Sequence, residues 1–337
     1  MTCCRCFLSG VSADRFATHH KIDGMNRPSF LCHQTLLALA KSVFYSVLLV
    51  SCGENSAPVK NIDRPLLATT LPVARMVEAV MGQPVDRLVP DEIDAEQWAP
   101  SEMQLAQMSE SFLISNGRGF ETKLRRYDLP RTSWLRSANM LAEPAVLHDV
   151  VEHQHGPEGS HSHGVVDGHT WVDPETAGKQ LEVIRQRLVQ EGLCGEQQSQ
   201  ENVRPLVDQL MQIHQSFAEI DPQSTVLYAN RAAYDYLART HGWNITSFAL
   251  DPKSPLPEEV ASQLEVMDRN QIFLFESPPC PQLTGALDEL EIQPVVLHTG
   301  ERPNHDGGWP ECLAAGAERL QNAIGSLLTQ EGPKANR

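Results

Sequence analysis

The chain has 337 residues, of which 41% are hydrophobic and 21% charged, so it has an ordinary globular composition and is long enough for two domains. Its formal net charge of −16 argues against a nucleic-acid partner, because phosphates bind to basic surfaces. An acidic surface suits a protein that meets cations, although acidity alone usually serves solubility.

The first 51 residues differ from the rest of the chain. Arg27 precedes an apolar run that ends in LVSC at Cys52, which is the pattern of a secretory signal and is too short and interrupted for a membrane span. LVSC resembles a bacterial lipobox, so we expect export, lipidation of Cys52 and a true start at Met25. A buried hydrophobic helix is the alternative. The polar residues 52–64 are expected to form a tether.

Cysteine is scarce in the remainder of the chain. After Cys52 only Cys194, Cys280 and Cys312 remain, without CxxC spacing, so a zinc ribbon or thioredoxin-type site is unsupported. At most one disulfide can form among the three, and Cys280–Cys312 is the candidate pair.

Strands and helices alternate over residues 65–172, which we predict to be an N-terminal lobe. PLLATTLP predicts a buried strand, VARMVEAVMG a helix that ends at Gly82, and VDRLVP a second strand. SEMQLAQMSESF then predicts a helix, FLIS a strand, and NGRGF a turn toward another helix. Alternation at this pace indicates a parallel sheet.

The same alternation returns over residues 221–330, the predicted C-terminal lobe. Its strands are expected in TVLYAN, NITSFAL, IFLFE and PVVLHTG, and its helices in AAYDYLARTHG, PEEVASQLEVMDR and WPECLAAGAERLQNAIGSLL. Residues 173–220 predict a linking helical segment that begins with Asp173 as N-cap and Pro174 in the first turn. The expected fold is therefore α/β, with two Rossmann-like lobes of parallel sheet, one long connecting helix and a cleft between the lobes.

Histidines gather just before the linking segment. The stretch 153–163 contains two HxH pairs separated by Gly, Pro and Ser, and imidazole is a good ligand for zinc and related metals. This His-rich loop is expected to capture metal in loose geometries, with an incidental polar loop as the alternative. Its four histidines are His153, His155, His161 and His163. His169 differs because Trp171 and the helix beginning near Asp173 follow it, which gives it the rigid support that a metal ligand needs.

At these residues the sequence resembles the solute-binding proteins of zinc and manganese ABC transporters. DGHTWVDP is similar to their DPHxWLDP motif, and many zinc members carry a histidine-rich loop before it. ISNGRGFE, with Asn116, Gly117 and Glu121, is similar to vyNGlglE, and AAYDYLARTHGW to dAFgYLarrYGL. The first strand, helix and second strand, and IFLFES, also match, so the resemblance covers roughly residues 65–330.

The resemblance implies that three histidines and one carboxylate bind a metal between two lobes. His169 matches the second histidine, but DAEQWAP places Glu96 at the first, and NRAAY places Arg231 at the third. The final carboxylate follows a strand after which this chain offers His298. Glu96 can ligate zinc, whereas Arg231 cannot, because its guanidinium stays protonated and repels a cation.

Two arrangements of the cleft therefore remain open. In the first, metal binds to rearranged ligands and Arg231 is turned aside; the ligands would be Glu96, His169 and His298, with His241 or Glu276 as additions. In the second, Glu96 and Arg231 form an ion pair that fills the ligand position.

The resemblance implies a lipid-anchored, periplasmic or cell-surface protein that is not an enzyme and delivers Zn²⁺, Mn²⁺ or a similar ion to an ABC permease. The alternative is a binding module of the same fold that acts as a metal buffer, chaperone or sensor through its His-rich loop. An exported zinc hydrolase ranks last, since the common catalytic signatures are absent and no second fixed histidine spacing accompanies Glu96 as a base. The sequence NHDGGW places a histidine beside an aspartate, for which a turn is the simpler interpretation.

Overall fold

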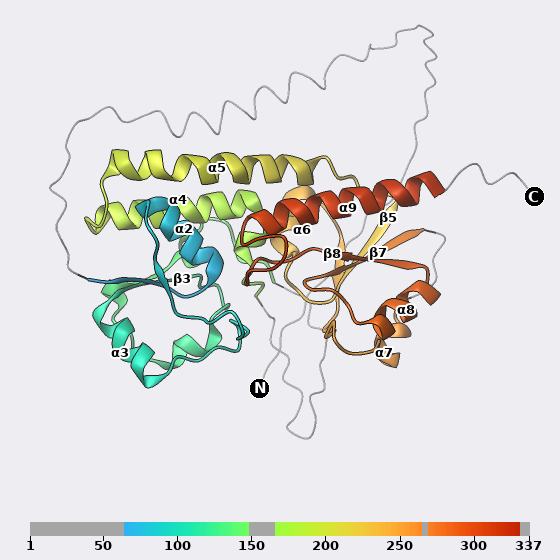
Figure 1. The fold of residues 1–337 in the computed structure, drawn as a ribbon, viewed down its shortest axis with the longest axis horizontal. Helices are drawn as coiled ribbons and strands as arrows, with labels where there is room; N and C mark the ends of the chain where they lie inside the picture. Colours follow the sequence, from blue (N-terminus) through green and yellow to red (C-terminus); the bar gives the residue numbers. More distant parts are fainter. Residues whose placement is uncertain (1–63, 148–165, 265–268, 331–337) are drawn as a thin grey trace, which may run out of the picture. The chain divides into compact units, whose positions relative to one another are not determined.

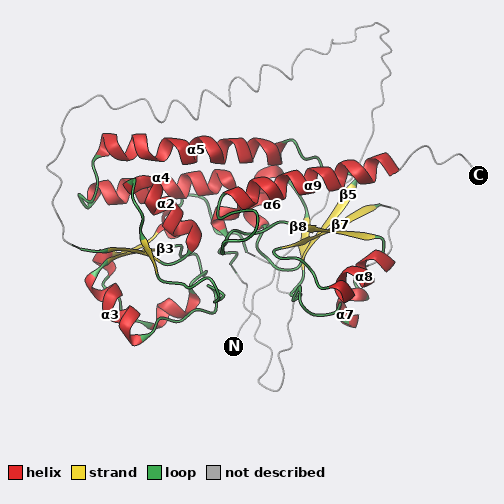
Figure 2. Cartoon of the chain, viewed as in Figure 1, coloured by secondary structure: helices red, strands yellow, loops and turns green. Residues whose placement is uncertain are grey.

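Two four-stranded parallel sheets frame the part of the chain that the computed structural model describes, namely residues 64–147, 166–264 and 269–330 (Figure 1, Figure 2). These residues all belong to one unit, Ser56–Arg337. The predicted signal, start and lipidation site, and the His-rich loop, lie outside the described residues. The predicted lobe boundaries stay predictions.

The first sheet has the strand order β2-β1-β3-β4. Its strands are short and apolar, and β3 is buried along its whole length, as expected where helices cover both faces of a parallel sheet. Leu67 pairs with both Asp86 and Leu113, and Ile114 pairs with Leu135. The strands are β1 (Leu66–Ala68), β2 (Asp86–Arg87), β3 (Phe112–Ser115) and β4 (Trp134–Arg136).

The helices of this lobe begin and end where their caps predict. α2 (Leu71–Met81) ends at Gly82, whose positive φ of 67° lets its N–H donate to the carbonyl of Glu78. α3 (Glu102–Glu110) begins with a capping box between Ser101 and Gln104. The expected helix after NGRGF is a short 3-10 turn, and two further such turns flank β4. These three segments are Thr122–Arg126, Arg131–Ser133 and Ser137–Met140.

The second sheet has the order β6-β5-β7-β8. α9 (Glu311–Gln330) and α8 (Pro281–Glu289) both contact β8 and lie on opposite sides of the sheet (Figure 1). Of the helix expected over PEEVASQLEVMDR, only the short α7 (Glu258–Ala261) is present among the described residues. Two elements, β4 and α8, were not predicted. The remaining elements are β5 (Thr225–Ala229), α6 (Asp235–His241), β6 (Ile245–Ser247), β7 (Asn270–Phe275) and β8 (Ile292–Val296).

The linking segment consists of α4 (Pro174–Gln190) and α5 (Glu196–Ala218), which pack against each other. Asp173 caps α4 as predicted, because its Oδ2 accepts the N–H of Thr176 at 3.1 Å. α5 contacts α2 of the first lobe and α9 of the second. The linking helices therefore provide a common support for both sheets.

The proposed disulfide is wrong, because Cys194, Cys280 and Cys312 are all free. The Sγ of Cys312 faces the backbone carbonyl of His298 at 3.8 Å, while that of Cys280 faces the carbonyl of Ser254 at 3.6 Å. The two cysteines thus contact different segments. Across the described ranges, no helix combines the length and the apolarity that crossing a bilayer requires.

Candidate functional site

His169 is held rigidly just before the 3-10 turn Thr170–Val172 and is 1% exposed. Its Nδ1 lies 2.8 Å from Oδ1 of Asp167, which also accepts the backbone N–H of His169 at 2.8 Å. The rings of Phe120 and Trp171 lie 5.1 and 5.3 Å from the imidazole, centroid to centroid. These contacts fix the ring plane and direct Nε2 toward the charged groups of the site.

A close backbone approach explains the glycine before His169. A Cβ on Gly168 would lie 2.7 Å from the Cβ of Phe120 and 2.9 Å from its Cα, which is closer than side chains tolerate. The Nδ2 of Asn116 donates to the carbonyl of Gly168 at 2.7 Å. The ISNGRGFE and DGHTWVDP motifs therefore meet at this contact.

Glu121 anchors the ISNGRGFE turn from within. Its carboxylate accepts the backbone N–H groups of Asn116 and Gly117 at 2.8 and 2.9 Å and the hydroxyl of Thr69 at 2.6 Å. Burial nevertheless raises the pKa of Glu121, against the effect of these hydrogen bonds. The motif is thus a structural support for His169.

Arg231 occupies the centre of the site. Its Nη2 lies 2.8 Å from Oε1 of Glu96, and its Nη1 lies 2.7 Å from Oε2 of Glu276. Arg231 follows β5 and Glu276 follows β7, so both stand where neighbouring parallel strands end. Burial opposes the charge on the guanidinium, but Glu301, Glu96 and Glu276 together raise the pKa of Arg231 well above its usual value.

Glu301 was missed at the sequence level. Its Oε1 lies 3.0 Å from Nε2 of His169 and 3.8 Å from Nη1 of Arg231, and its side chain is 7% exposed. Burial alone would raise the pKa of this carboxyl, yet Arg231 and His169 lower it to about 2. Its place shortly after the strand ending at Val296, where the resemblance expects a carboxylate, was the available signal.

The environment favours a protonated His169. Burial, the largest influence, and Arg231 both lower its pKa, but the hydrogen bonds to Asp167 and Glu301 and the charge of Asp167 outweigh them and raise it to about 10. At neutral pH, Nδ1–H therefore donates to Asp167 and Nε2–H to Glu301. Four carboxylates then face two cationic side chains, so the site carries excess negative charge. These carboxylates belong to Glu96, Asp167, Glu276 and Glu301.

Two other predicted ligands lie in separate groups. The Nδ1 of His298 lies 2.6 Å from the backbone carbonyl oxygen of Glu276, and its Nε2 lies 3.7 Å from Oδ2 of Asp306. Among the described residues, two triads have ligand-type atoms within 4.8 Å of one another, and neither includes His169. These triads are His298, His305 and Asp306, and Asp173, His214 and His241.

The donor atoms around His169 fit a divalent cation only after Arg231 leaves. The Nε2 of His169 lies 3.0 and 3.6 Å from the carboxylate oxygens of Glu301 and Glu96, which are spacings suited to shared coordination. The Nη2 of Arg231, however, lies 3.1 Å from the same Nε2, in the space that a metal would need. Of the two arrangements left open by the sequence, the structure therefore has the Arg231–Glu96 ion pair.

A family model described as zinc-uptake complex component A, periplasmic, matches residues 66–323. The chain belongs to this family. The sequence is also 23% identical over 316 residues to the zinc-binding lipoprotein AdcA of Streptococcus pneumoniae, a match that covers 88% of this chain. The chain spans about 62% of the length of that relative.

Solved structures show the same fold. The Zn(II)-bound ZnuA-like domain of Streptococcus pneumoniae AdcA superposes with a TM-score of 0.63 at 17% identity, over 77% of this chain and 98% of that domain. The metal-dependent lipoprotein YcdH of Bacillus subtilis gives 0.63 at 15% identity, over 77% and 99%. FpvC of Pseudomonas aeruginosa, in complex with Mn²⁺, gives 0.59 at 15% identity, over 80% and 99%. The two-lobed α/β fold predicted from the sequence is thus confirmed.

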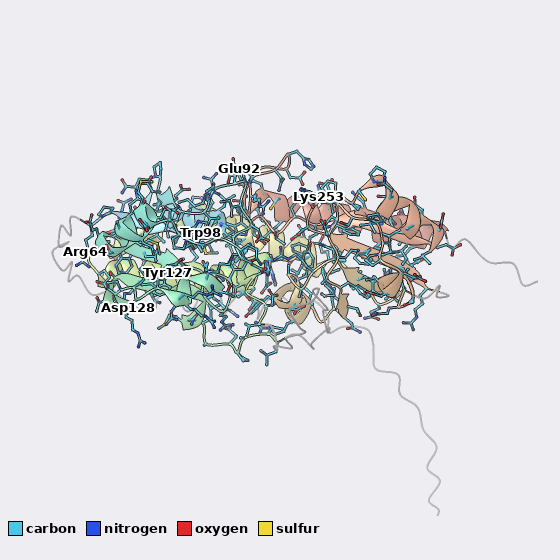
Figure 3. All side chains as sticks on the ribbon, turned by 90° about the horizontal axis from the view of Figure 1, so that it is seen from below. Arg64, Glu92, Trp98, Tyr127, Asp128 and Lys253 are labelled. Atoms are coloured by element: carbon cyan, nitrogen blue, oxygen red, sulfur yellow. The ribbon has the colours of Figure 1, made fainter. Side chains whose placement is uncertain are left out.

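Glu96 and Arg231, at positions where the resemblance led us to expect histidines, bind each other. Trp98, two residues after Glu96, is 3% exposed and lies within the first lobe, as does Tyr127 (Figure 3). Because Trp98 is buried, it anchors the loop that carries Glu96 in the first lobe.

Proposed function

We propose that the chain is an extracytoplasmic solute-binding protein, anchored through a lipid on Cys52, which captures zinc or a similar divalent metal for an ABC importer and catalyses no reaction. Membership of the zinc-uptake component A family supports this proposal. The zinc named for AdcA and the Mn²⁺ named for FpvC give the range of cargo.

One observation carries the proposal: carboxylates from both lobes surround the pair formed by His169 and Arg231 and outnumber these two side chains. Glu96 comes from the first lobe, whereas Glu276 and Glu301 come from the second. Such a set attracts a cation more strongly than a neutral or anionic solute. Its carboxylate-rich character suits harder ions such as Mn²⁺, while His169 suits zinc.

Metal capture in the cleft requires Arg231 to move. The ion would bind to Nε2 of His169 and to the carboxylates of Glu96 and Glu301, and His169 must lose its Nε2 proton to become a ligand. Arg231 would keep Glu276, its partner at 2.7 Å, as a counter-ion. The His-rich loop at 153–163 would supply metal, and the loaded protein would dock on the permease.

A second candidate function rests on the same arginine. If the guanidinium stays between Glu96 and Glu276, the cleft already holds its own cation, and metal binds to the His-rich loop alone. The protein would then act as a metal buffer, chaperone or sensor.

Zinc titration separates the two candidates. The full chain with His153, His155, His161 and His163 replaced by glutamine is titrated by calorimetry, with and without the additional change His169→Ala. The importer proposal expects a tight equivalent that is present in the parent variant and that His169→Ala removes. Absence of any tight equivalent that depends on His169 would overturn it in favour of the second candidate. Repeating the titration with Mn²⁺ tests the choice of cargo.

A further inference from the structure

Three side chains that could ligate a metal, none of them part of the group around His169, converge where three helices meet. Asp173 caps α4, His214 lies within α5, and His241 is the last residue of α6. One potential ligand atom of each lies within 4.8 Å of the others. Ligand atoms that share a tetrahedral zinc ion at about 2.0–2.2 Å lie about 3.3–3.6 Å apart, so the three would have to approach one another by at most about 1.5 Å to share one.

Each of these side chains has a buried polar atom that no hydrogen bond satisfies among the described residues. The atoms are Oδ1 of Asp173, Nδ1 of His214 and Nε2 of His241. Buried polar atoms are nearly always paired, so three unpaired ones in one cluster call for an occupant. The occupant must accept contact from a carboxylate and two imidazoles together.

The carboxylate of Asp173 is already oriented for this purpose. The residue is fully buried, and its Oδ2 accepts hydrogen bonds from the N–H and hydroxyl of Thr176 and from the hydroxyl of Thr240, at 3.1, 2.5 and 2.8 Å. These contacts use one oxygen and leave Oδ1 free. Fixing a ligand through its other atoms is how proteins preorganise metal sites.

The two imidazoles are positioned by aromatic packing. Their rings lie 5.1 Å apart, and the ring of His241 also lies 5.3 Å from Trp243 and 6.1 Å from Phe217. Burial, the largest influence, and His214 lower the pKa of His241, while the acidic Asp173 and Glu175 raise it. The junction thus places negative charge beside its two imidazoles.

We propose that Asp173, His214 and His241 form a second divalent-cation site, of zinc type, separate from the one around His169. Two imidazoles and one carboxylate are a common zinc ligand set and leave a fourth position for water. A bound ion would join α4 and α5 to α6 and so stabilise the junction between the linking helices and the second lobe. This inference does not depend on whether the cleft takes up cargo.

A bridging water is the competing occupant, since it too can satisfy several buried polar atoms. The full chain with His169 and the four histidines of the His-rich loop replaced by glutamine is therefore titrated with Co²⁺ and with Zn²⁺. We expect one bound equivalent, a cobalt spectrum of tetrahedral type and a higher melting temperature. Absence of binding with an unchanged melting temperature would mean water only and would overturn the proposal.

Matched substitutions in that background identify the ligands. His214→Gln and, separately, His241→Gln should each abolish the bound equivalent, with folding checked by circular dichroism without metal. Should His214→Gln fail to fold, His241→Gln decides. His298→Gln is the control, because it removes one imidazole from the other triad, in which Arg319 already pairs with Asp306 at 2.7 Å. Binding that survives both test changes, or that His298→Gln removes, would overturn the proposal.

Discussion

The Nη2 of Arg231 lies 2.8 Å from Oε1 of Glu96, so a residue following β5 is joined to the loop after β2. Its other nitrogen lies 2.7 Å from Glu276, and the buried Glu301 lies nearby. The guanidinium thereby takes the role of a cation shared by carboxylates of both lobes. Its removal should affect both the stability of the metal-free protein and its affinity for metal.

Arg231→Met should lower the free energy of unfolding of the chelator-treated protein by about 3 kcal/mol, because it leaves Glu301 buried without its arginine partner. Urea unfolding measures this change. The control is Arg75→Met, which removes an exposed pair with Glu78 and should cost no more than about 1 kcal/mol. Equal stability losses in the two variants would contradict the central role of Arg231.

The same Arg231→Met substitution should strengthen zinc binding at His169 by about tenfold or more. A unit charge about 4 Å from the metal opposes binding by about 1–4 kcal/mol, and 1.4 kcal/mol corresponds to tenfold in affinity. Competition with a zinc chelator measures the constant, in the chain whose His-rich loop histidines are replaced. An affinity equal to that of the parent would show that Arg231 does not compete with metal.

Glu301→Gln should make the free energy of unfolding less dependent on pH in the acidic range. The folded-state pKa of Glu301 is about 2, below its ordinary value of 4.5, so its ionised form stabilises the fold above pH 4.5. This contribution, about 3 kcal/mol from the pKa difference, is lost as pH falls from 4.5 toward 2. The stability difference between wild type and variant should therefore be constant at neutral pH and shrink in acid.

Urea unfolding of the chelator-treated proteins, measured at several values between about pH 3 and pH 8, tests how the stability difference depends on pH. The range spans about five units around the ordinary carboxyl pKa. Glu92→Gln, at an exposed residue labelled in Figure 3, serves as the control and should leave the profile unchanged. A difference for Glu301→Gln that does not vary with pH would contradict the assignment.

Gly168→Ala should destabilise the protein by about 1–3 kcal/mol and weaken metal binding, since the added methyl group meets the backbone of Phe120 and pushes the His169 turn outward. Gly178→Ala is matched to it, because that glycine lies inside α4 with open space around its Cβ position. There alanine should be neutral or stabilise by up to about 1 kcal/mol. Thermal unfolding and zinc titration compare the two variants. A Gly168→Ala protein with unchanged stability and zinc affinity would show that the His169 turn accommodates the methyl group.

Cys312 should resist alkylation in the folded protein. It is fully buried, and burial, together with nearby acidic groups, raises its pKa to about 12, so little thiolate is present at neutral pH. Cys280 is partly exposed and should react first. Iodoacetamide labelling followed by peptide mass spectrometry measures both rates, and rapid labelling of Cys312 without unfolding would be the contrary result.

Much of the fold follows from local patterns. Gly82 ends α2 and Asp173 begins α4 because a left-handed terminus and a side-chain cap need only neighbouring residues. β4 and α8 escaped prediction. β4 is a short strand between two 3-10 turns, and only Leu283 and Leu287 of α8 are buried, so neither shows a clear periodic pattern. Short elements depend on packing that the sequence pattern does not display.

The sequence by itself determined the α/β class and the helix ends at Gly82 and Asp173, because periodicity and capping act over short distances along the chain. Only the tertiary structure decided that Glu301 joins His169, that Arg231 turns inward, and that His241 lies with Asp173 and His214. Each of these contacts depends on where strand and helix ends meet in space. Charged side chains are reoriented there by partners far away in sequence, so no local pattern specifies them.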